Sequence, residues 1–450
     1  MALSGTPNTA LKGLLDEADF SAIGFAHRIR AAASPGSRGA QTSTTQVSRW
    51  LAGQTPRDET IELCAFVLTR KLGRPVSREA MGFLPAAKSA DGETLDGAAA
   101  RLWRVDASDN RQLLALPFAP QALDRPVMDW MIGNVAPPVP RVRIGRPVTG
   151  FDVIRAEEIL AMFRKADHAQ GAGGLRDVVV GYLTNNVADM LSRPPADAQT
   201  ETDLMVVAAG LCEMVGYQAV DVGAYGLAQR YYLQAIAFSA ATDGRAYASH
   251  LIAANVAHLA LHTGHPDEAV RLVQAARQGN VGLSSPAAEA AFHAVEARAY
   301  ARRLDEPATT QALIAADAAL ERSTVDNEPV WMRYFTPADL EDEKAHCMHD
   351  LGRPASAQEI ARSAIADLEP KRTRRLAIDN TLLATSLART GDIEEACAVG
   401  ITAADYSAQT QSHRTLLRIA ELREALEPYA DDRRVLEFEE YVRVTLPQAG

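Results

Sequence analysis

The chain has 450 residues, of which 47% are hydrophobic and 23% charged, an ordinary composition for a folded globular protein and not for a disordered or fibrous one. Its net charge is −11, yet residues 1–90 carry 11 Lys and Arg against 7 Asp and Glu, so a mildly basic N-terminal segment precedes an acidic remainder. No apolar run reaches the length of a membrane span and no signal-peptide pattern opens the chain, which predicts a cytoplasmic protein without membrane contact.

Residues 1–85 carry the helix signals of an N-terminal domain. A first helix is predicted over residues 10–18. Ser21 caps the second, whose Ile23, Ala26 and Ile29 recur as an apolar stripe that should face a core. Further helices are expected after Ser43, over residues 58–72 and over residues 75–81.

The third of these helices has the features of a recognition helix. Ser43 caps it and Gln46 reaches back, in an S-x-x-Q capping box. Val47 and Trp50 face the core, which leaves a polar outer face suited to a DNA major groove. Base contacts are expected from the first turn, and phosphate contacts from its flanks. The predicted DNA-binding residues are Thr44, Thr45, Gln46, Ser48, Arg49 and Arg57.

Residues 86–150 have the least regular pattern of the chain. Six prolines between positions 117 and 140 punctuate them, although residues 113–130 have room for short helices. Residues 139–150, VPRVRIGRPVTG, are extended and basic. We therefore predict an irregular, Pro-rich connector over residues 86–150.

From residue 151 to residue 445 the chain is Ala-rich and repetitive. Turn residues occur near Gly223, Gly264, Asp305, Gly352 and Gly391, at separations of 41, 41, 47 and 39 residues. Each turn lies between two helical stretches, the last four pairs being 250–261 with 267–276, 287–302 with 308–320, 340–351 with 355–368, and 376–389 with 393–405. This period predicts a tetratricopeptide-like α-solenoid, whose stacked pairs would present a concave groove.

Polar residues in the first helices of successive pairs are candidates for lining that groove. Asn185, Asn255, His258 and Asn380 are the predicted ligand-binding residues, for a small molecule or a peptide. The alternative for each is a hydrogen bond inside the core. Trp331, in the segment WMRYF, is interpreted as part of an aromatic plug between turns of the stack.

The order of the N-terminal helices is similar to that of the lambda-repressor-like (XRE-type) helix-turn-helix domains. Two features depart from that pattern: residues 31–43 separate the second and third helices where the usual turn has three or four residues, and Leu51 follows the Trp where many such domains carry Glu.

The whole chain resembles actinobacterial-type transcriptional regulators that join an XRE-like head to a tetratricopeptide-like region. The segments that carry this resemblance are SRWLAGQTPR (48–57), FRKADHAQGAGGLRD (163–177), AYGLAQRYYLQAI (224–236), WMRYF (331–335) and AHCMHDLGRP (345–354). The resemblance implies transcriptional control, often repression, of development or secondary metabolism.

No enzyme signature stands out in the sequence. Walker, G-x-G-x-x-G, H-E-x-x-H and G-x-S-x-G patterns are absent. Gly171–Gly174 precedes a helix and offers an anion-binding turn, but a flexible interhelical turn is the simpler interpretation. His258 and His262, and the group His346, Cys347 and His349, lack a third ligand at metal spacing. The four cysteines are widely spaced, as reduced thiols are. We expect no catalysis, cofactor or metal.

These observations predict an all-α protein: a lambda-repressor-like helix-turn-helix domain (1–85), a connector (86–150) and a tetratricopeptide-like α-solenoid (151–445). The predicted function is that of a homodimeric, nucleoid-associated transcriptional regulator that binds a double-stranded DNA operator and responds to a ligand or peptide. Dimerisation is expected because a single small head discriminates poorly between sequences. The competing hypothesis is a protein-interaction scaffold with a vestigial head.

Overall fold

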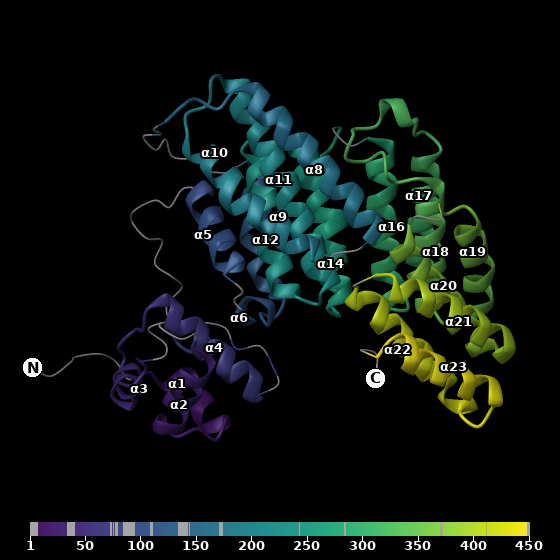
Figure 1. Ribbon diagram of the computed structural model, residues 1–450, viewed down its shortest axis with the longest axis horizontal. Coiled ribbons are helices and arrows are strands. Elements are labelled where there is room, and N and C mark those ends of the chain that lie inside the picture. The colour runs from purple at the N-terminus through teal and green to yellow at the C-terminus, as the bar shows by residue number, and fades with distance from the viewer. Residues whose placement is uncertain are drawn as a thin grey trace, which may run out of the picture. The chain divides into compact units, whose positions relative to one another are not determined.

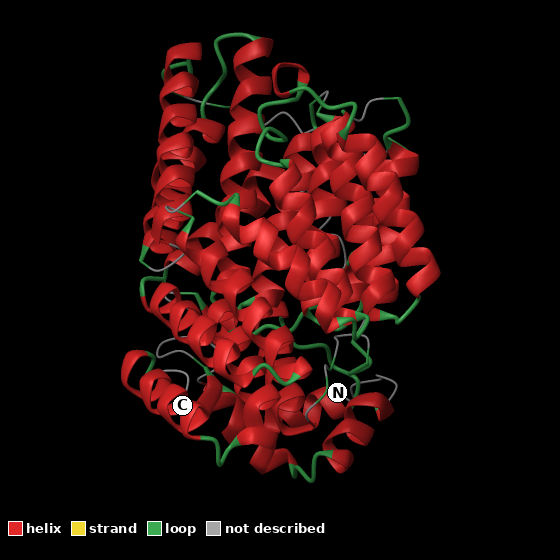
Figure 2. Cartoon of the chain, turned by 90° about the vertical axis from the view of Figure 1, so that its right-hand side faces the viewer, coloured by secondary structure: helices red, strands yellow, loops and turns green. Residues whose placement is uncertain are grey.

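The computed structural model describes residues 8–33, 41–72, 74, 76, 80–83, 95–108, 111–133, 143, 145–170, 174–242, 244–282, 285–369, 372–410 and 412–447. The secondary structure of these residues is helical (Figure 2), apart from one isolated β-bridge between Val148 and Pro195. The all-α prediction is thereby confirmed. The chain divides into two compact units, the head (Met1–Glu93) and the body (Thr94–Gly450).

The described part of the head contains four helices around one core. They are α1 (Thr9–Glu17), α2 (Ala22–Ala32), α3 (Thr44–Leu51) and α4 (Asp58–Leu72). Phe25, Ile29, Val47, Trp50 and Leu68 are among the side chains buried between them. The four predicted helices are therefore present, with ends within one or two residues of expectation. Most of the predicted helix over residues 75–81 and of the loop over residues 31–43 lies outside the described residues.

One predicted core position in the head is wrong. Ile23 was assigned to the apolar stripe of α2, but 68% of its surface is exposed. Phe25, Ala26 and Ile29 are the buried residues of this helix. Because Phe25 follows Ile23 by two residues, or about 200° around a helix, only one of the two can face the core.

Residues 95–131 depart from the irregular connector that the prolines suggested. They form α5 (Leu95–Ala107), α6 (Arg111–Leu114), the 3₁₀ turn η2 (Pro120–Ala122) and α7 (Asp124–Met131). Trp103 and Trp130 from this segment are buried in the same core as the helices that follow. Gly226 makes room for it, since a Cβ there would lie 2.4 Å from the carbonyl oxygen of Leu116. The segment is thus part of the body.

Buried polar contacts also join this segment to the later helices. The Arg176 guanidinium donates to Asp106 of α5 at 2.5 and 2.6 Å, and the Tyr231 hydroxyl donates to the same carboxylate at 2.7 Å. The Trp103 indole N–H donates to Gln234 at 3.0 Å. These bonds satisfy polar groups that burial would otherwise leave unpaired.

The rest of the body is a series of consecutive helices (Figure 1). The first group is α8 (Gly150–Gln170), α9 (Leu175–Tyr182), the π-helical segment η3 (Leu183–Val187), α10 (Ala188–Ser192), α11 (Ala198–Asp221), α12 (Tyr225–Ala240), α13 (Arg245–His250), the π-helical segment η4 (Leu251–Val256), α14 (Ala257–His262) and α15 (Pro266–Gly279). The second group is α16 (Pro286–Arg302), α17 (Glu306–Leu320), η5 (Val325–Asn327), α18 (Pro337–Asp350), α19 (Pro354–Ala366), α20 (Thr373–Thr390), α21 (Ile393–Ala408), α22 (His413–Leu426), η6 (Glu427–Tyr429) and α23 (Arg433–Thr445).

The helix pairs expected from the period are present at the predicted positions. Helices α16 and α17, α18 and α19, and α20 and α21 pack against each other as pairs, and α14, α16, α18, α20 and α22 pack in turn against the next of their set. Glycines with positive φ stand at four of the five predicted turns, for example Gly391 with φ 87°. At the fifth, near Asp305, Leu304 takes this left-handed conformation.

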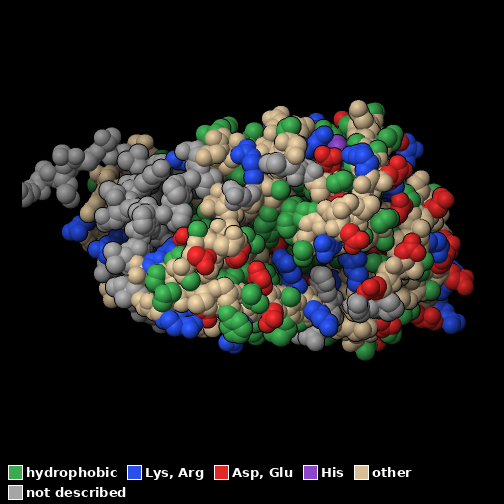
Figure 3. Space-filling model, turned by 90° about the horizontal axis from the view of Figure 1, so that it is seen from above, with side chains coloured by type: hydrophobic (Ala, Val, Ile, Leu, Met, Phe, Trp, Pro, Cys, Tyr) green, Lys and Arg blue, Asp and Glu red, His purple; other side chains and the backbone are tan. Residues whose placement is uncertain are grey.

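Helix α11 packs against α8, α9, α12 and α22. It is long and apolar enough to cross a membrane by length and composition, but 78% of its most apolar stretch is buried among other helices. This burial is typical of the core helix of a soluble protein. On the face of the body visible in Figure 3, Lys and Arg side chains are interspersed with Asp and Glu.

The series of pairs returns on itself. Arg374 of α20 is buried and bonds to Asp167 of α8 and Asp221 of α11, each at 3.1 Å. Its guanidinium also lies 4.9 Å from the centre of the Tyr217 ring. Ser412, at the start of α22, donates to Asp221 at 2.5 Å. We refer to these five residues as the closure cluster, because they join the end of the series to its beginning.

The closure cluster predicts a large loss of stability on mutation. In Arg374→Gln the buried carboxylates of Asp167 and Asp221 lose their cation, so the free energy of unfolding of the body should fall by about 3–5 kcal/mol. Urea unfolding of a Trp50→Phe background, in which Trp103, Trp130 and Trp331 report on the body, measures it. Arg433→Gln, which removes an exposed pair with Glu437 that water screens, is the control and should leave the stability of the body close to that of the wild type. Equal effects of the two variants would contradict the role of the cluster.

Candidate functional site

Helix α3 presents a polar, cation-bearing face. Its capping box forms as predicted: Ser43 Oγ accepts from the Gln46 amide at 3.3 Å, and Gln46 Oε1 accepts from the Ser43 amide at 2.7 Å. Val47 and Trp50 are 0% and 5% exposed and fix the orientation of the helix. Its outward residues are Thr45, Gln46, Ser48 and Arg49, which are exposed, and Thr44, which is half-buried.

Two of the predicted contact residues are partly engaged within the helix. Gln46 uses its Oε1 for the cap, and Ser48 donates to the Thr44 carbonyl at 3.1 Å. Arg49 makes no ion pair with any described residue of the head and is exposed, as is Arg57 beyond the end of α3. The exposed cation of α3 is thus available to an anionic partner.

Helix α2 adds to the positive charge beside α3. Arg28 and Arg30 are exposed on it, and neither α2 nor α3 contains an acidic residue. Arg30 also donates to the Thr42 carbonyl at 2.6 Å, which anchors the chain just before the cap of α3. The residues AHRIR (26–30) of α2 carried this signal in the sequence, although DNA contacts were predicted only for α3 and Arg57.

In the body, α16, α18 and α20 are each the first helix of a pair, and charged side chains of these three helices form ion pairs with one another. Arg298 donates to Glu343 at 2.8 Å. Arg375 contacts Asp342 at 2.7 Å and Asp379 at 3.0 Å. We name this set, together with His258, His262, Tyr217 and Arg414, the polar interior. Of the residues in the polar interior, only His258 was predicted from the sequence to bind a ligand.

The two histidines of the polar interior differ in their surroundings. Burial lowers the pKa of His258, with Arg298 and Arg414 adding to the effect and Glu343 opposing it. His262, one turn further along α14, is exposed to water, and the His258 side chain is 32% exposed. Water therefore reaches this edge of the polar interior.

The four predicted ligand residues do not converge on one place. Asn255 lies in η4, one helical turn before His258, and its buried Oδ1 has no hydrogen-bond partner among the described residues. Asn380 is buried and donates to the Leu376 carbonyl of its own helix at 2.8 Å, which is the core alternative. Asn185 belongs to a different site. Of the predicted set, Asn255 and His258 remain together.

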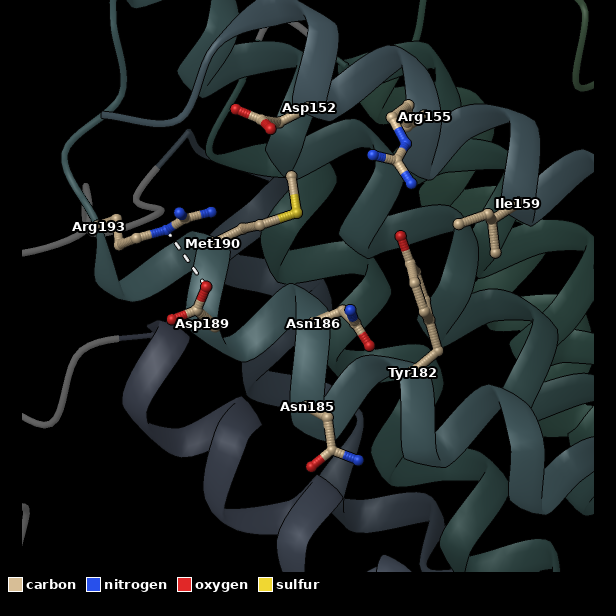
Figure 4. A pocket seen from close by; sticks show the side chains of 9 residues that line it. All are labelled: Asp152, Arg155, Ile159, Tyr182, Asn185, Asn186, Asp189, Met190 and Arg193. Atoms are coloured by element: carbon tan, nitrogen blue, oxygen red, sulfur yellow. Dashed lines mark ion pairs between the residues drawn. The ribbon is translucent and has the colours of Figure 1, made fainter. Parts of the chain in front are cut away.

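Asn185 and Asn186 lie on the π-helical segment η3 beside an open pocket of about 210 Å³ (Figure 4). Arg155 of α8 points into this pocket toward Tyr182, while Asn185 lies at its far edge. Arg193 pairs with Asp189 at 3.3 Å. Both π-helical segments carry a predicted asparagine, and such bulges often occur at functional positions.

Asp342, His346 and Asp379 bring their ligand atoms within 4.8 Å of one another, all buried. Asp342 precedes His346 by one turn of α18, so the expectation that no third ligand stands at metal spacing near His346 is wrong. Arg375 contacts both carboxylates and already supplies positive charge there. These contacts favour an internal ion cluster, so we assign no metal. Residues 171–173 of the proposed anion-binding turn lie outside the described residues.

The segment WMRYF and the cysteines behave as structural features. The ring centre of Trp331 lies 5.0 Å from that of His250 and 5.5 Å from that of Tyr247, and Met332 is fully buried. Tyr334 is 47% exposed, so the aromatic plug is only partly packed. All four cysteines are buried free thiols, and burial raises the pKa of Cys64, Cys212 and Cys347.

Comparison with known families bears on the head. Residues 11–84 match the SP15 N-terminal domain. The match begins in α1, includes α2, α3 and α4, and thus covers the α2–α3 face. No curated protein matches the chain. The matched residues all lie in the head.

A buried histidine predicts that acid destabilises the body. Burial lowers the pKa of His349 to about 4, with Arg389 next in effect, whereas an unfolded histidine has a pKa near 6.5. The unfolded state therefore takes up the proton first as the pH falls, so stability is present above pH 6.5 and is lost as the pH falls toward 4. This one residue should cost about 2 kcal/mol between pH 7.5 and pH 5.

The contribution of His349 is isolated by comparing wild type with His349→Gln. Urea unfolding at pH 7.5 and pH 5 should show a smaller loss of stability in the variant. Acidic groups with shifted pKa values, such as Asp342, are common to both proteins and cancel in the difference. Identical pH dependences would show that His349 titrates normally in the folded body.

Proposed function

We propose that this protein is a sequence-specific DNA-binding transcriptional regulator, with repression as the expected mode. The observation that carries the proposal is the α2–α3 face of the head. It combines a capped helix end, buried anchors at Val47 and Trp50, and exposed cations without a single carboxylate on either helix. Phosphates supply much of the affinity of such a face, and side chains of one helix in the major groove supply the specificity.

In this proposal the head acts as a lambda-repressor-like helix-turn-helix domain. Thr44, Thr45 and Arg49 read base edges, because the first turn of α3 would lie deepest in the groove. Gln46 and Ser48, which are engaged in the helix end, position the backbone, and Arg57 contacts phosphate. The cations of α2 extend the phosphate contacts. The protein would act in the cytoplasm, on the nucleoid.

The body acts as a tetratricopeptide-like solenoid that dimerises and receives the regulatory signal. Its consecutive helix pairs support this assignment, and the polar interior, with Asn255 and His258, supplies the groups that would contact an effector. An effector must bind the two shapes of the body with different affinity if it is to shift the positions of the two heads.

The readout is tested with Arg49→Ala. Loss of a bidentate contact to a guanine should reduce operator affinity by about 1–3 kcal/mol and relax one base position. Sequence selection from a random duplex library, followed by fluorescence anisotropy at fixed salt, measures both effects. Arg70→Ala removes the same charge from α4 and should keep the base preference. An Arg49→Ala protein with unchanged affinity and preference would overturn the assignment and favour the scaffold hypothesis.

The dimer is tested by separating the units. The head alone, residues 1–93, should bind the selected operator much more weakly than the full chain, because two joined heads contact two half-sites. Light scattering should show a dimer of the full chain at micromolar concentration. A monomer at that concentration, or equal operator affinity for head and full chain, would contradict dimeric binding.

A further inference from the structure

The pocket beside η3 contains a cation that no described residue neutralises. Arg155 of α8 is exposed, and its guanidinium points into the pocket toward Tyr182 (Figure 4). It forms no ion pair and no hydrogen bond with a described residue. The other three charged residues that line the pocket are engaged in ion pairs. Arg155 is therefore the group that can attract a ligand of opposite charge.

The two carboxylates of the lining are both paired. Asp152 accepts from the Arg146 guanidinium at 2.8 and 3.0 Å, and from the amide and hydroxyl of Thr149 at 2.9 and 2.8 Å. Asp189 pairs with Arg193 at 3.3 Å. These pairs cancel in charge, so the pocket has a single net positive charge, that of the unpaired guanidinium. Such a site matches a ligand with one negative charge and not a multiply charged anion.

Two more polar groups beside Arg155 have no hydrogen bond with a described residue. The Tyr182 hydroxyl faces the Arg155 guanidinium, and the Asn186 amide points toward Tyr182 (Figure 4). Tyr182 ends α9 and Asn186 lies in η3, four residues later, so both are on one side of the helix. Burial raises the pKa of Tyr182 against the opposing effect of Arg155, which keeps the hydroxyl protonated and able to donate. These groups can bind the oxygens of a ligand.

The remainder of the lining is apolar. Ile159 of α8 and Met190 of α10 line the pocket together with the Tyr182 ring. The buried Phe163 packs edge-to-face against this ring, with the two ring centres 5.9 Å apart, and holds it in place. The pocket therefore offers polar groups to one part of a ligand and hydrocarbon to another.

The volume of the pocket sets the size of the ligand. It is about 210 Å³. An apolar cavity of about 150 Å³ can hold a benzene molecule. The pocket therefore has room for a six-membered ring that carries one further group. A carboxylate is the group that suits Arg155, because the fork of guanidinium N–H groups matches its two oxygens and its single charge.

We propose that this pocket binds a small monocarboxylate with an apolar body of about the size of a benzene ring. The carboxylate pairs with Arg155 and accepts from the Tyr182 hydroxyl, and the Asn186 amide adds a hydrogen bond. The apolar body lies against Ile159 and Met190. This binding is a property of the body alone and does not depend on the proposed function, whose effector contacts lie in the polar interior.

Calorimetric titration of the full chain with benzoate at pH 7 tests this site. We expect saturable binding of one benzoate per chain. Arg155→Gln should weaken binding about tenfold or more, because a charge-assisted pair is lost. Tyr182→Phe removes one neutral donor and should weaken binding by roughly two- to tenfold. The circular dichroism of both variants should stay that of the wild type, since Arg155 is exposed and Phe keeps the packed ring.

Controls separate recognition of the carboxylate from general binding. Benzamide has the same ring without the charge, and acetate has the charge without the ring, so both should bind at least tenfold more weakly than benzoate. Arg125→Gln removes an exposed arginine of α7 outside the pocket and should bind benzoate like the wild type. Absence of saturable binding, benzoate affinity in Arg155→Gln equal to that of the wild type, or equal affinity for benzamide or acetate would overturn the proposal.

Operator binding is measured separately by fluorescence anisotropy. Its failure with intact benzoate binding would reject the proposed function and leave this pocket standing. Intact operator binding without benzoate binding would reject the pocket and leave the proposed function standing.

Discussion

The ion pairs of Arg374 with Asp167 and Asp221 are the constraint on which the arrangement of the body depends. When helix pairs contact only their neighbours, no contact joins the first pair to the last, and the stack is open at both ends. Here the first turn of α20 reaches back to α8 and α11, across 207 and 153 residues of sequence. This contact joins α20 to α8 and α11, while α16, α18 and α20 pair their charged side chains with one another.

Closure explains why so many charges lie inside an otherwise Ala-rich body. Small side chains let paired helices approach closely, and the apolar stripes are buried between the two helices of each pair. The face of each first helix that is not buried within its own pair then packs against the neighbouring first helices. Its carboxylates and guanidinium groups neutralise one another locally, as Glu343 and Arg298 do. Arg414 differs from them, because its guanidinium lies 5.5 Å from the centre of the Tyr217 ring and has no described carboxylate within ion-pair distance.

The sequence was sufficient for local structure and insufficient for what depends on distant partners. The spacing of glycine turns located the pairs from α16 to α21, and the pattern around Ser43 and Gln46 located α3 with its capping box, because both signals lie within a few turns of the residues they govern. Residues 95–131 were misjudged because their prolines stand between short helices, and the glycines that accommodate them, such as Gly226, lie more than 100 residues away.

The same limit applied to the candidate sites. The outward residues of α3 could be predicted from the sequence, because the spacing of Val47 and Trp50 on one helix fixes which of its faces is buried. The polar interior required knowing which helices face each other, and Asn185, Asn255 and Asn380 carried no mark of the different surroundings that separate them.

The return of α20 and α22 to the start of the series also affects how the body folds. An open stack can nucleate at any pair and grow by local contacts, so its rate and its tolerance of truncation resemble those of a one-dimensional chain of units. A contact such as that between Asp167 and Arg374 instead requires the ends of a long loop to meet before its free energy is gained. The body should therefore unfold as one cooperative unit. In a nascent chain that stops before α20, the carboxylates of Asp167 and Asp221 lack the guanidinium of Arg374 as their partner.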